Sequence, residues 1–149
     1  MHADALAQYL HDHIPLSRAM AVTVQTVEPD TVVLAAPLAP NINHRDTVFG
    51  GSASAVAILA AWSLLHTRLR REGLASRLVI QRNQMEYLQP IVGDFSAQAT
   101  LDADTPWPGF VRMLARKGKA RATVRAVLRC QGLVVGELVG EFVALDVGG

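Results

Sequence analysis

The sequence has little excess of either charge and only one cysteine. Its 14 Lys and Arg residues nearly balance its 13 Asp and Glu residues, so the formal net charge is +1. A charge this small gives no overall field that favours nucleic acid or an acidic membrane surface. Cys130 cannot form an intrachain disulfide by itself and lies outside any metal-ligand spacing, so we expect a small buried side chain there. Nucleic-acid partners and a cysteine-based metal site are therefore not expected.

Motifs of the common nucleotide and metal enzymes are also lacking. The chain has no P-loop, no GxGxxG after a strand, no HExxH, no GxSxG and no Cys–His zinc spacing. We therefore expect no metal and no cofactor. The N-terminus lacks the basic start and apolar stretch of a secretory signal, which makes a cytoplasmic location the expectation.

Long hydrophobic runs are scarce, and residues 50–65 form the one that resembles a membrane span. This stretch carries no charge, yet it is shorter than the roughly 18 to 20 apolar residues that a span needs. Arg68, Arg70 and Arg71 follow soon after it. We therefore expect no membrane span and interpret the stretch as a helix enclosed by protein, because a helix apolar on every side must be buried on every side.

The composition is that of a folded protein. Half of the 149 residues are hydrophobic and 18% are charged, and the length suits one domain over residues 1–149. Residues 102–109 are expected to form a loop, and residues 110–116 fit a strand or a helical turn. Periodicity predicts helices over residues 3–14 and from 50 to a closing glycine at 73, and strands over residues 20–27, 31–37, 78–87, 94–100, 119–130 and 133–145.

The C-terminal third has the clearest pattern. Charged and apolar residues alternate over 119–130, which is typical of a strand with one wet and one buried face. The buried faces of this strand and its partner are rich in Ala and Gly, so the long helix can approach them closely. Too few helices separate the strands to allow parallel crossovers. We therefore predict an α+β protein with an antiparallel sheet wrapped around one long central helix, the arrangement of the hot-dog fold.

The register of the C-terminal hairpin is predicted from its charges. A three-residue loop ending in a left-handed Gly132 would place Arg125 opposite Glu137 and Arg121 opposite Glu141. A two-residue turn would instead bring residues of opposite parity together, and the arginines would face the apolar set. We therefore expect the three-residue loop.

The start of the long helix is the expected site of chemistry. Gly50 and Gly51 permit close approach to the backbone, and the first amide N–H groups of a helix have no carbonyl partner within it. Such a helix start can bind negative charge, including the oxyanion that forms when water attacks a thioester. The alternative interpretation is a tight turn into the helix, with Ser52 or Ser54 near the cap position.

An ordered set of residues across nearly the whole chain supports the first interpretation. It resembles the thioesterase family of the YiiD C-terminal type, which combines an asparagine-containing loop, a T-x-F-G-G-S turn, a helix tryptophan and a later Y-x-x-P followed by an acid. The matching residues are Asn43, Thr47, Phe49, Gly50, Gly51, Ser52, Trp62, Tyr87, Pro90 and Asp94.

The resemblance implies hydrolysis of an acyl thioester carried by coenzyme A or an acyl-carrier protein, in a homodimer or dimer of dimers. Two departures from other hot-dog thioesterases leave the general base open. Phe49 stands where many of them have histidine, and residues 54–65 contain no acid. A non-catalytic module that binds acyl thioesters is therefore an alternative, and a dehydratase of 3-hydroxyacyl chains is a weaker one.

Three residues are the catalytic candidates. Asp46 is the best replacement base, with a loop residue paired to Arg45 or Lys119 as its alternative, and Asn43 would orient water or donate to the thioester oxygen. Gly51 would supply the amide for the oxyanion. Trp62 and Tyr87 are expected to be wall residues, and His44 an exposed one. The expected substrate-binding residues are His44, Thr47, Phe49, Gly50, Ser52, Trp62 and Tyr87.

Overall fold

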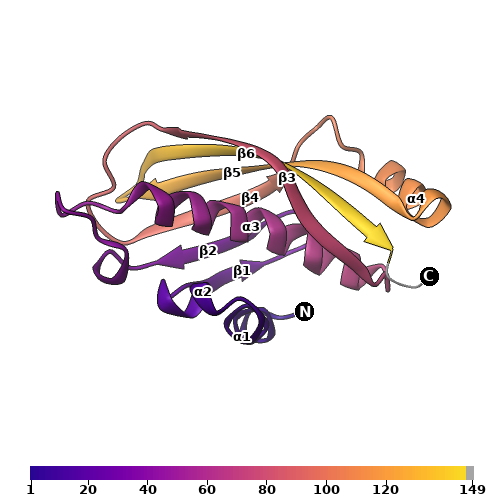
Figure 1. Cartoon of the computed structure of the whole chain (residues 1–149), viewed down its shortest axis with the longest axis horizontal. Helices are drawn as coiled ribbons and strands as arrows, with labels where there is room; N and C mark the ends of the chain where they lie inside the picture. Colours follow the sequence, from indigo (N-terminus) through magenta and orange to yellow (C-terminus); the bar gives the residue numbers. More distant parts are fainter. Residues whose placement is uncertain (147–149) are drawn as a thin grey trace.

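The computed structural model describes residues 1–146, in which one long helix lies across a six-stranded sheet (Figure 1). Every strand pair is antiparallel, and the strand order is β1-β2-β4-β5-β6-β3. The predicted α+β hot-dog architecture is therefore confirmed. The elements are α1 (Ala3–His13), α2 (Pro15–Ala19), β1 (Thr23–Val27), β2 (Val32–Ala36), the short helix η1 (Ala39–Asn41), α3 (Gly50–Arg71), β3 (Ser76–Tyr87), β4 (Phe95–Leu101), α4 (Trp107–Lys117), β5 (Lys119–Cys130) and β6 (Leu133–Asp146).

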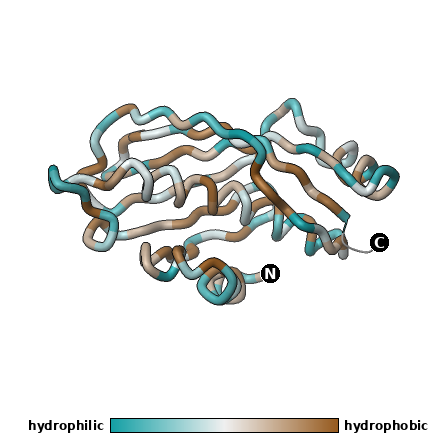
Figure 2. Tube along the Cα trace, in the orientation of Figure 1, coloured by the Kyte–Doolittle hydropathy of each residue, from teal (hydrophilic) through white to brown (hydrophobic). Residues whose placement is uncertain are grey.

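Small side chains let α3 lie close to the sheet, as its uncharged sequence predicts. Ala57, Ala60 and Ala61 are fully buried on the helix, and alanines of β4 and β5 are buried opposite it. Figure 2 shows hydrophobic segments along α3 and the strands that flank it. Among residues 1–146, no helix is long and apolar enough to cross a membrane.

The helix predicted over residues 3–14 is confirmed, since α1 ends at His13, but α2 was not predicted. Pro15 begins α2, because proline lacks only an N–H that the first turn of a helix leaves unpaired. Residues 107–117 form α4, whereas the sequence predicted a loop up to residue 109 and either a strand or a helical turn over residues 110–116. Pro108 is tolerated in its first turn, and Gly118 ends the helix in the left-handed conformation with a φ of 70°.

The predicted register of the C-terminal hairpin is wrong by two residues. A two-residue turn of Gln131 and Gly132 connects the strands, and a register shift follows between Leu128 and Arg129. Arg125 therefore lies opposite Val139, not Glu137, and Arg121 lies opposite Val143, not Glu141. At this shift β6 has one residue more than β5. The two-residue turn would by itself place wet residues opposite buried ones, and the additional residue restores the pairing of like faces. The buried and wet faces are consequently as predicted, with Ala122 and Ala126 buried.

The turn itself offers a test of local strain. Gln131 and Gly132 have φ angles of 53° and 79°, the combination for which Asn-Gly is preferred. Gln131→Asn is expected to raise the free energy of unfolding by about 0.5 to 1 kcal/mol, because asparagine tolerates the left-handed conformation better than glutamine. Urea denaturation measures this change. A variant no more stable than the wild type would show that the turn stores no such strain.

Candidate active site

The loop before α3 is held together by the side chain of Asn43. Its Oδ1 accepts hydrogen bonds from the backbone N–H of Arg45 (2.8 Å) and Thr47 (3.2 Å). Its Nδ2 donates to the Thr47 hydroxyl at 2.9 Å and to the Val48 carbonyl at 3.3 Å. An antiparallel bridge between Ile42 and Val48 closes the loop. The Asn43 amide is thus fully engaged in ordering the backbone that carries the other candidates.

Asp46 occupies a strained position at the turn of this loop. Its φ is 63°, in the left-handed region that aspartate enters more readily than most residues. Its side chain is exposed and forms no ion pair with Arg45, Lys119 or any other residue among 1–146. The carboxylate is therefore available to a ligand or to water, rather than held in the ion pair considered as its alternative role.

The start of α3 is uncapped. The N-cap residue is Phe49, whose side chain makes no capping hydrogen bond, and Ala53 is the first residue whose N–H bonds back to the Phe49 carbonyl, at 3.1 Å. The N–H groups of Gly50, Gly51 and Ser52 have no acceptor within the described residues. Neither Ser52 nor Ser54 caps the helix, so these amides remain open to an anion.

Two aromatic rings cover the glycine pair. A Cβ placed on Gly51 would lie 2.3 Å from Cε2 of Phe49, so the exposed Phe49 ring rests on this glycine. The Tyr87 ring is 3.4 Å from the corresponding position on Gly50, and its hydroxyl donates to the Gly50 carbonyl at 3.1 Å. The end of β3 is thereby fastened to the start of α3.

A cavity of about 370 Å³ lies beside this junction. Thr47, Ala53 and Tyr87 line it, together with the segment that follows β3. A larger cavity, of about 570 Å³, lies elsewhere, against α4 and β5. The helix start therefore borders a pocket of moderate size.

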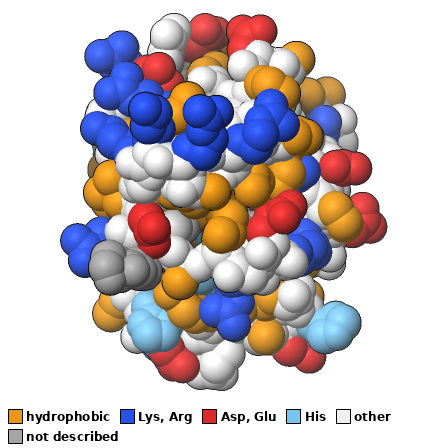
Figure 3. Space-filling view, turned by 90° about the vertical axis from the view of Figure 1, so that its right-hand side faces the viewer, with side chains coloured by type: hydrophobic (Ala, Val, Ile, Leu, Met, Phe, Trp, Pro, Cys, Tyr) orange, Lys and Arg blue, Asp and Glu red, His pale blue; other side chains and the backbone are white. Residues whose placement is uncertain are grey.

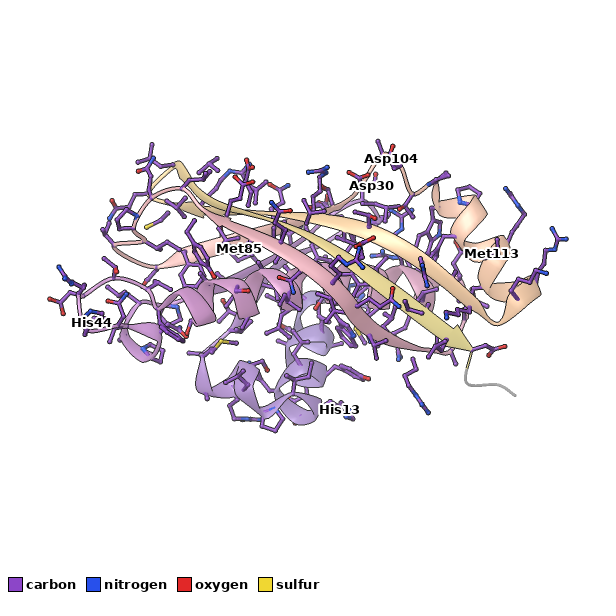
Figure 4. All side chains as sticks on the ribbon, turned by 45° about the horizontal axis from the view of Figure 1, so that its top comes forward. His13, Asp30, His44, Met85, Asp104 and Met113 are labelled. Carbon is purple, nitrogen blue, oxygen red and sulfur yellow. The ribbon has the colours of Figure 1, made fainter. Side chains whose placement is uncertain are left out.

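The remaining candidate residues do not all lie at the start of α3. Ser52 is half-buried next to Gly51, whereas His44 is exposed at the outer end of the loop (Figure 4). Trp62 lies twelve residues along α3 from Gly50, about 18 Å away at the rise of an α-helix. Its indole donates to the Leu78 carbonyl at 3.3 Å. The structure thus gathers the loop, the glycine pair and Tyr87 at one place, and leaves Trp62 outside it.

The sequence analysis missed Asn41, which is hydrogen-bonded to the segments that precede the start of α3. This side chain is buried, and its Nδ2 donates to the carbonyls of Met20 at 2.9 Å and Pro37 at 2.8 Å. The backbone carbonyl of Asn41 accepts the Phe49 N–H at 2.8 Å. A polar residue directly after Pro40 looks like an ordinary loop residue, because none of these contacts can be seen in the sequence.

A second missed feature is an aromatic cluster around His66. Its ring stacks on Trp62 with centroids 4.6 Å apart and lies 4.6 Å from the Tyr9 ring. Burial, together with the nearby charges of Arg70 and His13, lowers the pKa of His66 to about 4. Its Nε2 is buried and has no hydrogen-bond partner within the described residues. His66 is therefore neutral at pH 7.

The lowered pKa of His66 predicts a pH-dependent loss of stability. The folded state resists protonation, whereas the unfolded chain takes up the proton near pH 6.5, so stability is full above that pH and falls as the pH drops toward 4. Partial exposure of the ring reduces the loss to about 1 to 2 kcal/mol. Urea unfolding at pH 7.5 and 4.5 should show a smaller loss for His66→Phe, which keeps a stacking ring. Equal losses in both proteins would refute this assignment.

No group of three or more His, Cys, Asp or Glu side chains among residues 1–146 is placed to hold a metal ion. What the site offers is therefore an open carboxylate in the loop, three amides at the helix start without an acceptor among residues 1–146, and a pocket lined by both segments and by residues 87–91.

Solved structures of other proteins share the fold of this chain. A protein of unknown function from Chlorobaculum tepidum TLS matches with a TM-score of 0.90 and 28% identity, over 97% of this chain and 94% of that one. A "putative thioesterase" from Shewanella oneidensis matches with a TM-score of 0.86 and 24% identity, over 97% of both chains. A thioesterase from Haemophilus influenzae shares the fold at a TM-score of 0.81 with 10% identity, over 100% of this chain and 94% of that one.

The family comparison covers almost the whole chain. Residues 3–146 match the model of the family described as "Putative thioesterase (yiiD_Cterm)". This span includes the loop, the helix start and Tyr87, which carried the resemblance in the sequence. The chain therefore belongs to the thioesterase family of the YiiD C-terminal type.

Proposed function

We propose that the protein hydrolyses acyl thioesters carried by coenzyme A or an acyl-carrier protein, acting in the cytoplasm as a single domain. The observation that carries this proposal is the uncapped start of α3, where the N–H groups of residues 50–52 have no acceptor within residues 1–146. Thr47 and Ala53, on either side of these residues, line a pocket of about 370 Å³. Membership in a thioesterase family supports the same reaction.

Thioester hydrolysis requires two kinds of catalytic group in the site. A base removes a proton as water attacks the acyl carbon, and donors stabilise the oxyanion formed from the carbonyl oxygen. The C–S bond then breaks, and the sulfur leaves as a thiol after taking up a proton. In our proposal the Gly51 N–H is the principal oxyanion donor, and one such donor is worth roughly 3 to 4 kcal/mol in the transition state.

Asp46 is the base in this proposal, because its carboxylate is exposed, unpaired among residues 1–146 and close in sequence to the helix start. Asn43 acts as a positioning residue, since its four hydrogen bonds hold the loop. Phe49, together with Thr47 and Tyr87, which line the pocket, would contact the acyl group. The other proposed substrate contacts are His44, Gly50, Ser52 and, from farther along α3, Trp62.

A second copy of the chain would complete this site. β3 is an edge strand of twelve residues whose second half is exposed on both faces, and long bare edges are generally covered in native proteins. Exposed apolar side chains gather along this edge and at the helix start: Phe49, Val79, Tyr87, Leu88 and Val92. We therefore propose a homodimer, or a dimer of dimers, formed by pairing β3 with its copy.

Charge placed on β3 should separate the protomers. Gln81→Glu with Asn83→Glu adds two like charges per chain at exposed positions near the proposed axis, where each meets its copy. Light scattering is expected to show a shift from dimer to monomer, with activity lost at low protein concentration. Thr23→Glu with Gln25→Glu adds the same charge to β1, the opposite edge, and should leave the dimer intact. A wild-type monomer at working concentration would contradict the proposal.

The absence of an acid in residues 54–65 favours the one competing function, a module that binds acyl thioesters without cleaving them. Thiol release from a panel of acyl-coenzyme A and acyl-carrier-protein substrates separates the two. Saturable turnover by the purified protein supports hydrolysis. Saturable binding without turnover supports the binding module, and dehydration of a 3-hydroxyacyl chain would support neither.

A further inference from the structure

The cavity of about 570 Å³ lies at the opposite end of α3 from the candidate active site. It is bounded by α4, by the loop before it and by the first residues of β5 (Figure 1). Its apolar surface comes from Pro106, Phe110, Met113 and Ala120. Met113 is 49% exposed and lies on α4 (Figure 4), where it adds a flexible apolar side chain to the lining of the groove.

Cations border this apolar groove. Lys117, Lys119 and Arg121 line it, and Arg112 and Arg116 occupy further exposed positions of α4. None forms an ion pair with another residue of the described part of the chain, and Asp104 is the one carboxylate that lines the groove. Figure 3, which views this end of the molecule, shows Lys and Arg side chains in a row above exposed hydrophobic ones.

An apolar groove with a cationic rim complements an acidic amphipathic helix, whose apolar residues enter the groove while its carboxylates meet the rim. A small anionic ligand fits less well. Small-molecule sites enclose most of the ligand and fix it with a few precisely placed polar groups. Here the cations are exposed and distributed over two elements, an arrangement that suits contact with the extended surface of a protein partner.

We propose that this groove docks an acyl-carrier protein through an acidic helix, which makes the carrier protein, rather than coenzyme A, the preferred source of the thioester. This inference rests on the proposed function for its substrate, but the docking itself is a separate physical claim. The groove is lined by parts of α4 and β5 that the proposed chemistry does not use.

The groove is too far from the helix start of its own chain for a short reach. The 22 residues of α3 span about 33 Å, with α4 beyond the far end. The dimer proposed above changes this geometry. β3 runs back along α3, so that Tyr87 contacts the helix start while Ser76 pairs with Asp146, beside the end of α4. Antiparallel pairing of β3 with its copy brings the helix start of the second chain toward this end. A carrier docked on one protomer therefore serves the site of the other.

Binding of holo acyl-carrier protein, whose arm carries no acyl group, tests docking without any need for turnover. The dissociation constant is measured by calorimetry for the full-length protein at 50 and 200 mM salt. We expect saturable binding that weakens with salt, and at least a tenfold loss in Lys119→Glu with Arg121→Glu. The matched control is Arg18→Glu with Arg129→Glu, which changes the net charge equally at exposed positions on α2 and at the far end of β5.

Hydrolysis distinguishes failure of docking from failure of the proposed function. The double variant on the groove should raise KM for acyl-carrier protein at least tenfold while acyl-coenzyme A hydrolysis stays unchanged. The proposal is overturned if holo carrier protein does not bind, or if the groove variant and its control bind it equally. It is also overturned if the groove variant loses as much activity on acyl-coenzyme A as on acyl-carrier protein. If no thioester is cleaved but the carrier still binds through the groove, the docking inference stands and the hydrolytic function does not.

Discussion

Asp46→Asn is expected to lower kcat for thioester hydrolysis by about 10²- to 10⁴-fold, the usual contribution of a positioned general base. The substitution removes the proton acceptor but keeps the size of the side chain. Asparagine also adopts the left-handed conformation that residue 46 requires, where the φ is 63°, so the loop should keep its shape. Steady-state thiol release measures the effect, and an unchanged melting temperature shows that the fold is intact.

A charge control separates this role from the general electrostatics of the loop. Arg45→Gln changes the adjacent exposed charge and should leave kcat within a factor of a few. Asp46 would lose its assigned role if Asp46→Asn turned over substrate as fast as the wild type. The base would then have to come from elsewhere, including the second chain of the proposed dimer.

Asn41→Leu is expected to cost about 2 to 4 kcal/mol of folding free energy. The side chain is 2% exposed and donates to two carbonyls, those of Met20 and Pro37. Each lost hydrogen bond removes about 1 kcal/mol, and the carbonyls left without a donor add a further desolvation cost. Asn41→Asp should cost at least as much at pH 7, because an ionised carboxylate offers neither carbonyl a donor. Urea denaturation measures both changes.

Gln8→Leu is the matched control, since it replaces an exposed amide whose hydrogen bond to Asp12 lies on the surface of α1. It should change stability by less than about 0.5 kcal/mol. A loss of similar size in both variants would mean that burial of Asn41 contributes little. The backbone carbonyl of Asn41, which accepts the Phe49 N–H, is kept in both variants, so the helix start changes only as far as the loop backbone moves.

The parts of the fold that sequence predicts are those encoded by local periodicity. The strict alternation of β5 determines a strand and its buried face, and the uncharged run of α3 determines a long helix; both elements are confirmed. Burial of α3 on every side is not, since Ala55, Ile58 and Trp62 are only partly buried. α4 was not predicted because Trp107, Pro108 and Gly109 resemble a turn, although proline fits the first turn of a helix. The hairpin register failed because a short turn and a compensating shift leave the faces unchanged.

The candidate site, like the fold, was predictable where it depends on local sequence. The loop, the uncapped helix start and Tyr87 are brought together as their order in the family pattern implies. The displacement of Trp62 followed from helix geometry alone, since twelve residues span about 18 Å. Asn41 and His66 were missed because their environments come from contacts with distant segments, which no local pattern encodes.

The central claim is that the free amides at the start of α3 receive the thioester carbonyl. Amide chemical shifts in a ¹⁵N-labelled protein, titrated with a coenzyme A analogue whose thioester is replaced by a non-cleavable ketone, test this directly. We expect the largest shifts on the N–H groups of Gly50, Gly51 and Ser52, with smaller ones at Thr47 and Tyr87. Saturable binding that leaves these amides unmoved, and instead shifts residues around His66 or in the groove beside α4, would contradict it.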